Sequence, residues 1–306
     1  MERKDALISA VVFSKDRAMQ LDATLRSLRL HCRDAHVVEM SVLYAASSER
    51  HACQYVQLAK DYPDIKFVLE RDFKEDLLLL IAPASFLLLL VDDNIFVKEF
   101  YAADAVSFLQ ANSDVLAFSL RLGRNTVYAY AYGKYQRLPE FAEKDSSILT
   151  FDWKTGERDF NYPCDISSTL YRKSDLAPLL ERIPFSNPNL LEGRLDANKY
   201  EFSGQSRLAC FERSVTFCNP ANKVQRVLPN NRSGRRKQYA ADTLAEKFDQ
   251  GVRIKVEAYA SLVPKGCHQE VKLCFMTVMA GDAVKTSTWT QRLGKLFRPR
   301  HDIGLE

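Results

Sequence analysis

The sequence has little of several features that mark specialised classes of protein. Its seven cysteines are an odd number, they are scattered between positions 32 and 274, and no Cys-x-x-Cys pair occurs. This pattern argues against a disulfide framework or a zinc site, and it predicts reduced thiols in a cytoplasmic protein. Glycine and proline, at 11 residues each, are too few for a collagen-like or Pro-rich chain.

Long apolar runs and a strong net charge are also missing. The longest apolar stretch, Leu77–Val91, is interrupted by Pro83 and Ser85, whereas a membrane helix needs about 20 apolar residues. The segment Met1–Phe13 has charges and then a short apolar run without a small-residue cleavage site, so we expect a strand there and not a signal peptide. A formal charge of +4 is too mild to indicate a nucleic-acid partner, and none is expected.

Strands and helices alternate regularly over the first 125 residues. Continuous apolar runs such as Leu7–Phe13 and Phe86–Val91 are typical of strands buried on both faces, and helical patterns separate them. This alternation predicts an α/β fold with a mostly parallel central sheet and helices on both faces. The later chain is less regular, and we expect strands at Val127–Tyr132 and Val271–Phe275 and a helix at Leu190–Tyr200.

The most distinctive motif follows the most apolar strand, where Leu87–Val91 leads directly into Asp92, Asp93 and Asn94. Three oxygen-bearing side chains at the carboxyl end of a strand suit Mg²⁺ or Mn²⁺, which would neutralise a departing diphosphate. Two adjacent carboxylates repel each other, and a bound cation relieves that repulsion. An ordinary Asp-Asp-Asn turn is the alternative interpretation.

Two segments resemble the glycosyltransferase family 2-like proteins. One is the strand, polar turn and helix Val11–Leu28, and the other is Asp92-Asp93-Asn94, which falls where that family has its DxD motif. The resemblance covers residues 7–30 and 86–97 well, and the overall order extends it to about residue 276. It implies a GT-A-like fold with a smaller acceptor-side sheet, a divalent metal, and a nucleoside diphosphate sugar donor, with UDP-sugars favoured.

By position, the resemblance implies that Ser14, Asp16 and Arg17 line the nucleotide pocket, and that Asp92 faces the ribose or the metal. The alternatives are a helix N-cap for Asp16 and a solvated charge for Arg17. The family's acidic residue after the second strand is missing, because Tyr44-Ala-Ala-Ser-Ser48 stands there.

The metal itself would contact Asp92, Asp93 and Asn94. Asn94 stands at the family's third acidic position and is a weaker ligand than a carboxylate. His268 is a further candidate metal ligand, because several GT-A enzymes place a histidine late in the domain, although a lone histidine is more often structural.

Four further residues are candidates for chemistry at the acceptor and the phosphates. Glu192 is the candidate base that takes a proton from the acceptor hydroxyl in an inverting transfer, and its alternative is a capping box with Asn189. Asp165 is the second candidate for this role. Arg121 and Arg124 are candidates for binding the donor phosphates, and a solvated loop is the alternative.

Aromatic and basic segments suggest further contacts. Tyr128, Tyr130 and Tyr132 alternate, and ordinary strand packing is favoured over stacking on a sugar. The basic loop at 223–237 suits a segment that closes over a diphosphate or an anionic acceptor, or a plain solvated loop. The tail at 285–306 has the composition of a basic amphipathic helix, which predicts peripheral contact with an anionic membrane.

Together these features predict a single GT-A-like unit followed by the basic tail. Residues 1–125 would bind the nucleotide sugar, and residues 126–284 would bind the acceptor. The expected function is metal-dependent, inverting hexosyl transfer to a glycan or lipid-linked saccharide, as in polysaccharide biosynthesis. A non-catalytic nucleotide- or carbohydrate-binding protein on the same fold is the alternative.

Overall fold

The computed structural model describes residues 7–145, 147–224, 234 and 236–278. Within these residues the chain forms a nine-stranded sheet in the order β3-β2-β1-β4-β11-β6-β12-β10-β9. Its strands are β1 (Ile8–Lys15), β2 (Val38–Ala45), β3 (Lys66–Leu69), β4 (Phe86–Val91), β6 (Val115–Ser119), β9 (Ala142–Asp145), β10 (Ile148–Asp152), β11 (Thr169–Arg172) and β12 (Arg207–Phe211).

The sheet is mostly parallel, as the sequence predicts. Strands β3, β2, β1 and β4 pair in parallel, and β12 is parallel to β6. Strand β11 lies between β4 and β6 and is antiparallel to both, while β10 is antiparallel to β12 and β9. The β11 pairing brings the start of a late strand beside the end of β4, and this juxtaposition positions the candidate site.

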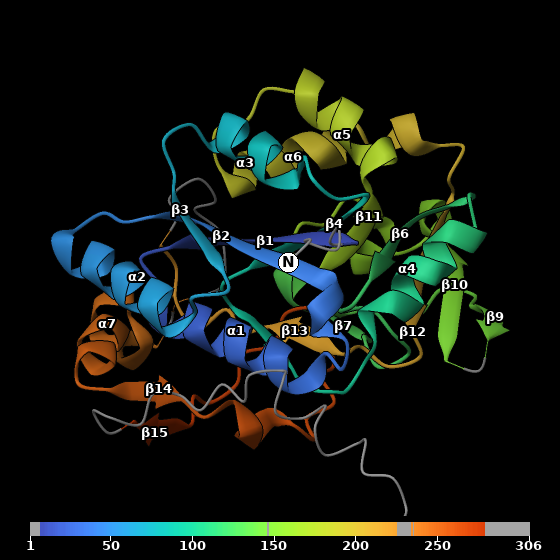
Figure 1. The fold of residues 1–306 in the computed structure, drawn as a ribbon. Helices are drawn as coiled ribbons and strands as arrows, with labels where there is room; N and C mark the ends of the chain where they lie inside the picture. The colour runs from blue at the N-terminus through green and yellow to red at the C-terminus, as the bar shows by residue number, and fades with distance from the viewer. Residues whose placement is uncertain (1–6, 146, 225–233, 235, 279–306) are drawn as a thin grey trace, which may run out of the picture.

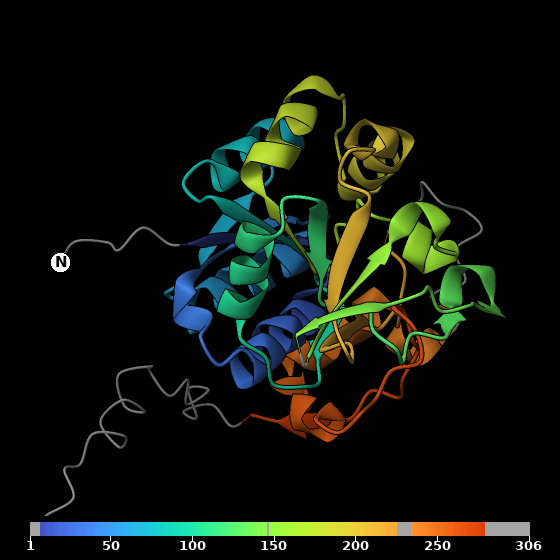
Figure 2. The same cartoon turned by 90° about the vertical axis from the view of Figure 1, so that its right-hand side faces the viewer.

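Helices cover both faces of the sheet. One face carries α1 (Ala18–His31), α2 (Glu49–Asp61), α4 (Ala102–Ala111) and α7 (Ala241–Asp249), and the other carries α3 (Phe73–Ile81), α5 (Lys173–Arg182) and α6 (Pro188–Ala197) (Figure 1). The expected α/β architecture is therefore confirmed. Figure 2 shows the late, orange part of the chain on the same side of the sheet as the blue helix α1.

Three two-stranded sheets lie outside the central sheet in the described residues. They are β5 (Asn94–Phe96) with β13 (Thr216–Cys218), β7 (Tyr128–Ala129) with β8 (Lys134–Tyr135), and β14 (Val252–Ile254) with β15 (Phe275–Thr277).

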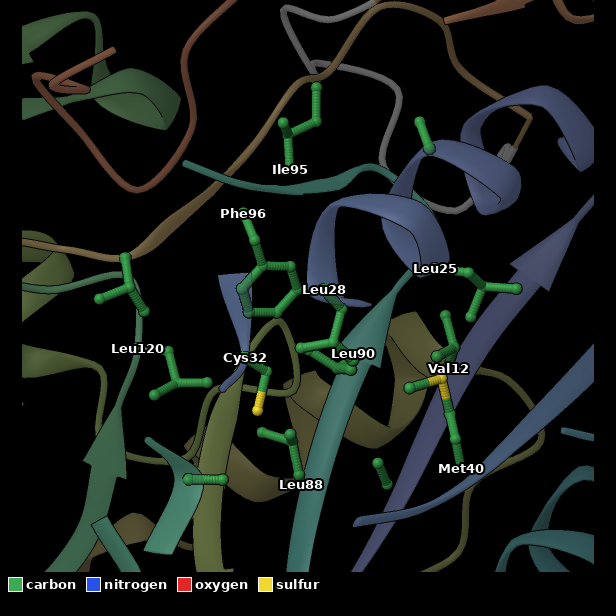
Figure 3. Close-up of a cluster of buried hydrophobic side chains, with 14 of the residues drawn as sticks. Val12, Leu25, Leu28, Cys32, Met40, Leu88, Leu90, Ile95, Phe96 and Leu120 are labelled. Atoms are coloured by element: carbon green, nitrogen blue, oxygen red, sulfur yellow. The ribbon is translucent and has the colours of Figure 1, made fainter. Parts of the chain in front are cut away.

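The central strands are fixed by apolar side chains on both faces. Val12 of β1 and Leu88 and Leu90 of β4 belong to the same buried cluster as Leu25 and Leu28 of α1 (Figure 3). The intervening residues of both strands face the cluster under the other helix layer. Since each fully buried leucine contributes about 1.5–3 kcal/mol, the end of β4 is a rigid platform for the polar turn that follows.

Two strand predictions are wrong in part. The expected strand Val127–Tyr132 continues only to Ala129, because residues 130–132 form a 3₁₀ turn that ends at Gly133 with a left-handed φ of 63°. The expected strand Val271–Phe275 instead begins at Phe275.

Most of the basic segments lie outside the described residues. Of the loop at 223–237, residues 225–233 and 235 are not described, and the whole tail at 285–306 lies outside as well. Within the described part of the chain, no helix is both long enough and apolar enough to cross a membrane.

Candidate functional site

Asp92 is the centre of a polar cluster at the carboxyl ends of β1 and β4. Its side chain accepts hydrogen bonds from Ser14 Oγ at 2.9 Å and from the Lys15 N–H at 3.3 Å, and it pairs with Arg17 Nη1 at 2.9 Å. These partners lie close because β1 and β4 are parallel neighbours whose ends meet at one edge. The structure therefore brings together Ser14, Arg17 and Asp92, which the family resemblance assigns to one pocket.

Arg17 is paired and largely buried, so the interpretation as a solvated charge is wrong. Its Nη1 lies 3.6 Å from Asp93 Oδ2, and its Nη2 donates to the Asn222 carbonyl at 2.8 Å. Burial by itself would lower the pKa of Arg17, but the charges of Asp92 and Asp93 raise it above its ordinary value. Arg17 is thus a permanent cation between two carboxylates.

Tyr55 is a part of this cluster that sequence reasoning missed. Its hydroxyl lies 2.6 Å from Ser14 Oγ and accepts a hydrogen bond from the Arg17 N–H at 3.2 Å. Tyr55 lies on α2, where helical periodicity marks it only as a core residue. Its contact with the end of β1 holds the Ser14–Arg17 turn against the second helix.

Asp16 lies at the same edge with an unusual backbone. Its φ of 55° is left-handed, a conformation that a non-glycine residue adopts rarely and often at functional sites. Its carboxylate accepts hydrogen bonds from Ser47 N–H at 2.7 Å and Ser47 Oγ at 2.6 Å, and it does not cap α1. The helix N-cap interpretation is therefore wrong, and Asp16 instead supplies a carboxylate beside the loop after β2, where the expected acidic residue is absent.

The residues expected to hold a metal do not form a matching ligand set. Asn94 is fully buried, its Oδ1 accepts the Val91 N–H at 2.9 Å, and its Nδ2 points to Ser167 O and Cys218 Sγ. Its amide therefore closes the turn. Among the described residues, no group of three or more His, Cys, Asp or Glu side chains is placed to hold a metal ion.

His268 and Asp93 also differ from the expected metal ligands. Burial, followed by the charge of Arg121, lowers the pKa of His268 to about 3, and its ring lies 6.2 Å from that of Tyr130. Burial raises the pKa of Asp93 to about 6 against the opposing charge of Arg17. The side chains present here fit an internal guanidinium better than a divalent metal.

A second cluster is built around a buried ion pair. Arg121 Nη2 donates to Asp165 Oδ1, and Asp165 also accepts hydrogen bonds from Ser167 N–H at 2.9 Å and Thr169 Oγ1 at 2.8 Å. Both charged side chains are buried, so their pairing holds the segment before β11 in place. Arg121 was expected to bind the donor phosphates, but in the structure its guanidinium is already paired with Asp165.

Arg124, the other candidate for the donor phosphates, belongs to the surface near the sheet edge. It pairs with Glu143 at 2.6 Å, and its guanidinium lies 5.1 Å from the ring centre of Phe141. The structure does not bring it into the Arg121–Asp165 pair. A solvated loop position is the simpler description of Arg124.

Glu192 lies beside the ion pair and not in a helix cap. Helix α6 is capped by Asn187, whose side chain accepts the Leu190 N–H at 3.0 Å, so the expected Asn189–Glu192 capping box is wrong. The Glu192 carboxyl group is hydrogen-bonded to the Asp165 side chain and to the Ile166 N–H. Burial, and next the charge of Asp165, raise its pKa to about 7, which suits a group that accepts a proton near neutrality.

A small polar cavity adjoins this second cluster. It is lined by Ser119, Arg121, Leu122, Asp159, Tyr162, Pro163, Asp165, Thr169, Leu208 and Cys267. Tyr162 is close enough to Glu192 for that carboxylate to raise the pKa of its hydroxyl, after the larger effect of burial. Hydrophobic periodicity does not single out Tyr162, because it lies in an irregular segment.

No protein-family model matches the chain. Among curated proteins, the bifunctional glycosyltransferase pgtA of Dictyostelium discoideum is 24% identical over 218 residues. The match covers 66% of this chain and 28% of the relative, so the chain spans little more than a quarter of that protein's length.

Solved structures to which the chain is similar include two complexes with nucleotide ligands. Mannosyltransferase PcManGT from Pyrobaculum calidifontis, in complex with GDP-Man and Mn²⁺, is 15% identical with a TM-score of 0.42, over 65% of this chain and 52% of that chain. S. aureus TarS 1-349 in complex with UDP is 17% identical with a TM-score of 0.45, over 79% of this chain and 72% of that chain.

Proposed function

We propose that this chain is a glycosyltransferase that moves a sugar from a nucleoside diphosphate sugar to an acceptor hydroxyl. The observation that carries the proposal is the Glu192 carboxyl group, whose pKa of about 7 makes it a proton acceptor at neutral pH. The 24% identity to a glycosyltransferase over 66% of the chain supports the same reaction class.

The donor would bind at the carboxyl ends of β1 and β4. Ser14, Asp16, Arg17 and Asp92 meet there, at the edge where ligands of open α/β sheets bind. Residues 1–125 supply these side chains, and we assign them the nucleotide sugar, with UDP-sugars as the first candidates. Residues 126–284 supply Glu192 and the acceptor side.

The proposed chemistry is a single displacement with inversion. The Glu192 carboxylate takes the proton of the acceptor hydroxyl while its oxygen attacks the sugar carbon, and the diphosphate leaves from the opposite face. Asp165 holds Arg121 and Glu192 in one hydrogen-bonded group and does not itself need to accept the proton. We assign a hexose as the transferred sugar and a glycan or lipid-linked saccharide as the acceptor, with the tail at 285–306 as a candidate membrane contact.

The test is the release of nucleoside diphosphate from a panel of nucleotide sugars, with and without saccharide acceptors. We expect one donor to be turned over, and we expect Glu192→Gln to reduce turnover by about 10²- to 10⁴-fold while nucleotide binding is retained. Nucleotide binding without turnover of any donor in the wild-type chain would instead favour a non-catalytic nucleotide-binding protein. Absence of both binding and turnover would refute the proposal.

A further inference from the structure

We infer that Arg17 is the cation of the Asp92–Asp93 pair, and that this chain binds a nucleoside diphosphate without a divalent metal. The inference rests on the proposed function for the ligand, because it names the charge that the donor's diphosphate meets. It does not rest on that function for the ion pair, which lies within the chain itself.

The position of the guanidinium carries the argument. Arg17 Nη1 lies 2.9 Å from Asp92 Oδ1 and 3.6 Å from Asp93 Oδ2, so one nitrogen serves both carboxylates. Only 12% of the Arg17 side chain is exposed, against 5% and 15% for the two carboxylates. Because the group is largely shielded from water, the attraction is screened less than at an exposed pair.

The oxygen atoms that a metal needs are already engaged. Asp92 Oδ2 accepts hydrogen bonds from Ser14 Oγ and from the Lys15 N–H, and Asp92 Oδ1 accepts a hydrogen bond from Arg17 Nη1. Asn94 Oδ1 accepts the Val91 N–H within the turn. A divalent cation would have to displace these donors, whereas Mg²⁺ and Mn²⁺ favour freely available oxygen ligands.

The backbone also fixes Arg17 in this position. Its Nη2 donates to the Asn222 carbonyl at 2.8 Å, and its N–H donates to the Tyr55 hydroxyl at 3.2 Å. An arginine that is held both at its backbone N–H and at its guanidinium is a preorganised charge and costs little further ordering when a ligand arrives.

One Arg17 nitrogen has no partner in the described structure. Nε is buried, and no hydrogen bond from it is formed. A buried donor without an acceptor is costly in a folded protein, so an acceptor atom brought by a ligand would stabilise this position. A diphosphate oxygen is an acceptor of the right charge, and arginine binds phosphate oxygens well.

The first experiment tests the ion pair alone, by electron paramagnetic resonance of Mn²⁺ added to the chain without nucleotide. We expect the wild-type chain to leave the signal of free Mn²⁺ unchanged, because Arg17 holds the carboxylates. One tightly bound Mn²⁺ that is lost in Asp93→Asn would overturn the inference, and this outcome would leave the proposed transferase function untouched.

The second experiment measures binding of UDP, GDP, CDP and ADP, each by calorimetry in EDTA and in Mn²⁺. We expect the nucleotide that binds to have the same affinity in both conditions, and Arg17→Gln to weaken it by about tenfold or more. The matched control Arg124→Gln removes the arginine of the exposed pair with Glu143, and it should leave the nucleotide affinity unchanged.

Two outcomes of the second experiment are decisive in different ways. Binding that strengthens by about tenfold or more with Mn²⁺ overturns the inference and leaves the proposed function in place. Failure of every nucleotide to bind under both conditions overturns the proposed function and, with it, the diphosphate part of the inference. If Arg17→Gln does not fold, Arg17→Lys keeps the charge without the fork geometry and should bind nucleotide more weakly.

Discussion

The substitution Glu192→Gln removes a proton acceptor and keeps the shape of the side chain. In the wild-type chain, burial and then the charge of Asp165 raise the pKa of Glu192 from 4.5 to about 7, while Arg121 opposes the shift. The carboxylate is therefore present mainly above about pH 7. We expect kcat/KM of the wild-type chain to rise with pH through this value and then to level off.

The size of the effect on turnover follows from the role of a general base. Such a group contributes about 10²- to 10⁴-fold to the rate. We expect Glu192→Gln to lose this factor, and the pH dependence near 7 should disappear with the titrating group. The affinity for the nucleotide should stay the same, because Glu192 lies beside Asp165 and not in the Arg17–Asp92 cluster.

Stability should change in the opposite direction. The folded chain holds the Glu192 proton more tightly than the unfolded chain does, so the wild-type protein loses stability as the pH rises from 4.5 to about 7. This difference corresponds to on the order of 3 kcal/mol above that range. Glutamine has no charge to bury, so the variant should be the more stable protein at about pH 8, and the two should be alike at about pH 4.

Two measurements check this reasoning. The first is release of nucleoside diphosphate from the donor, and the second is urea unfolding at the high and the low pH. The matched control is Glu181→Gln, which makes the same chemical change at an exposed position of α5. Full turnover in Glu192→Gln would refute the role as a base, and a loss of stability at high pH would refute the argument from burial.

Three further predictions concern the second cluster, α6 and the thiols. Arg121→Gln leaves Asp165 as a buried charge without its partner, so the free energy of unfolding should fall by about 3–5 kcal/mol. Adding Asp165→Asn removes that charge and should restore part of the lost free energy. If urea unfolding shows no recovery in the double variant, the pairing is contradicted. Asn187→Ala removes the cap of α6 and should lower the free energy of unfolding in urea by about 1 kcal/mol. An unchanged urea midpoint would mean that the cap does not stabilise the fold. Cys53 is the exposed thiol, so a thiol reagent should label one cysteine of the native chain in a fast kinetic phase. Cys53→Ser should remove this fast phase, and a fast phase that persists would be inconsistent with the burial of the other cysteines.

The local elements were predictable where burial imposes a pattern along the chain. The strand Phe86–Val91 has the bounds expected from its apolar residues. The order of the strands was not predictable in the same way. Thr169–Arg172 enters the sheet antiparallel between β4 and β6, and this non-local pairing leaves no periodic signal in the sequence.

The site was predictable at the level of which segments meet, but not of which atoms pair. The resemblance to family 2-like proteins assigned Ser14, Arg17 and Asp92 to one pocket, and the structure brings them together because the parallel strands β1 and β4 end at the same edge. The inward turn of Asn94 was not predictable, because its amide bonds to Ser167 and Cys218 from distant segments. From spacing in the sequence alone, a polar side chain such as that of Asn94 can equally close a turn or bind a metal, and its bonding partners decide between the two.

Cys218 joins the two clusters and thereby sets their separation. Its sulfur accepts hydrogen bonds from Asn94 Nδ2 at 3.3 Å and from Arg121 Nη1 at 3.9 Å, and its thiol is hydrogen-bonded to Asp93. The ladder of β5 and β13 places it there, because Cys218 pairs directly with Asn94. The Asp92–Asn94 turn and the Arg121–Asp165 pair are therefore spaced by a small sheet that lies outside the central one.

Both halves of the chain therefore contribute contacts to the cluster around Asp92. The segment after β13 also contacts the cluster around Asp92, since the Asn219 N–H donates to the Asp93 carbonyl at 2.8 Å and the Asn222 carbonyl accepts a hydrogen bond from Arg17. A boundary near residue 125 thus separates the halves in sequence but not in space. Cys218 contacts both Asn94 and Arg121, and the charge of Arg121 opposes the raised pKa of Glu192. A substitution at Cys218 that changes its volume should therefore change the nucleotide affinity and the pKa of Glu192 together.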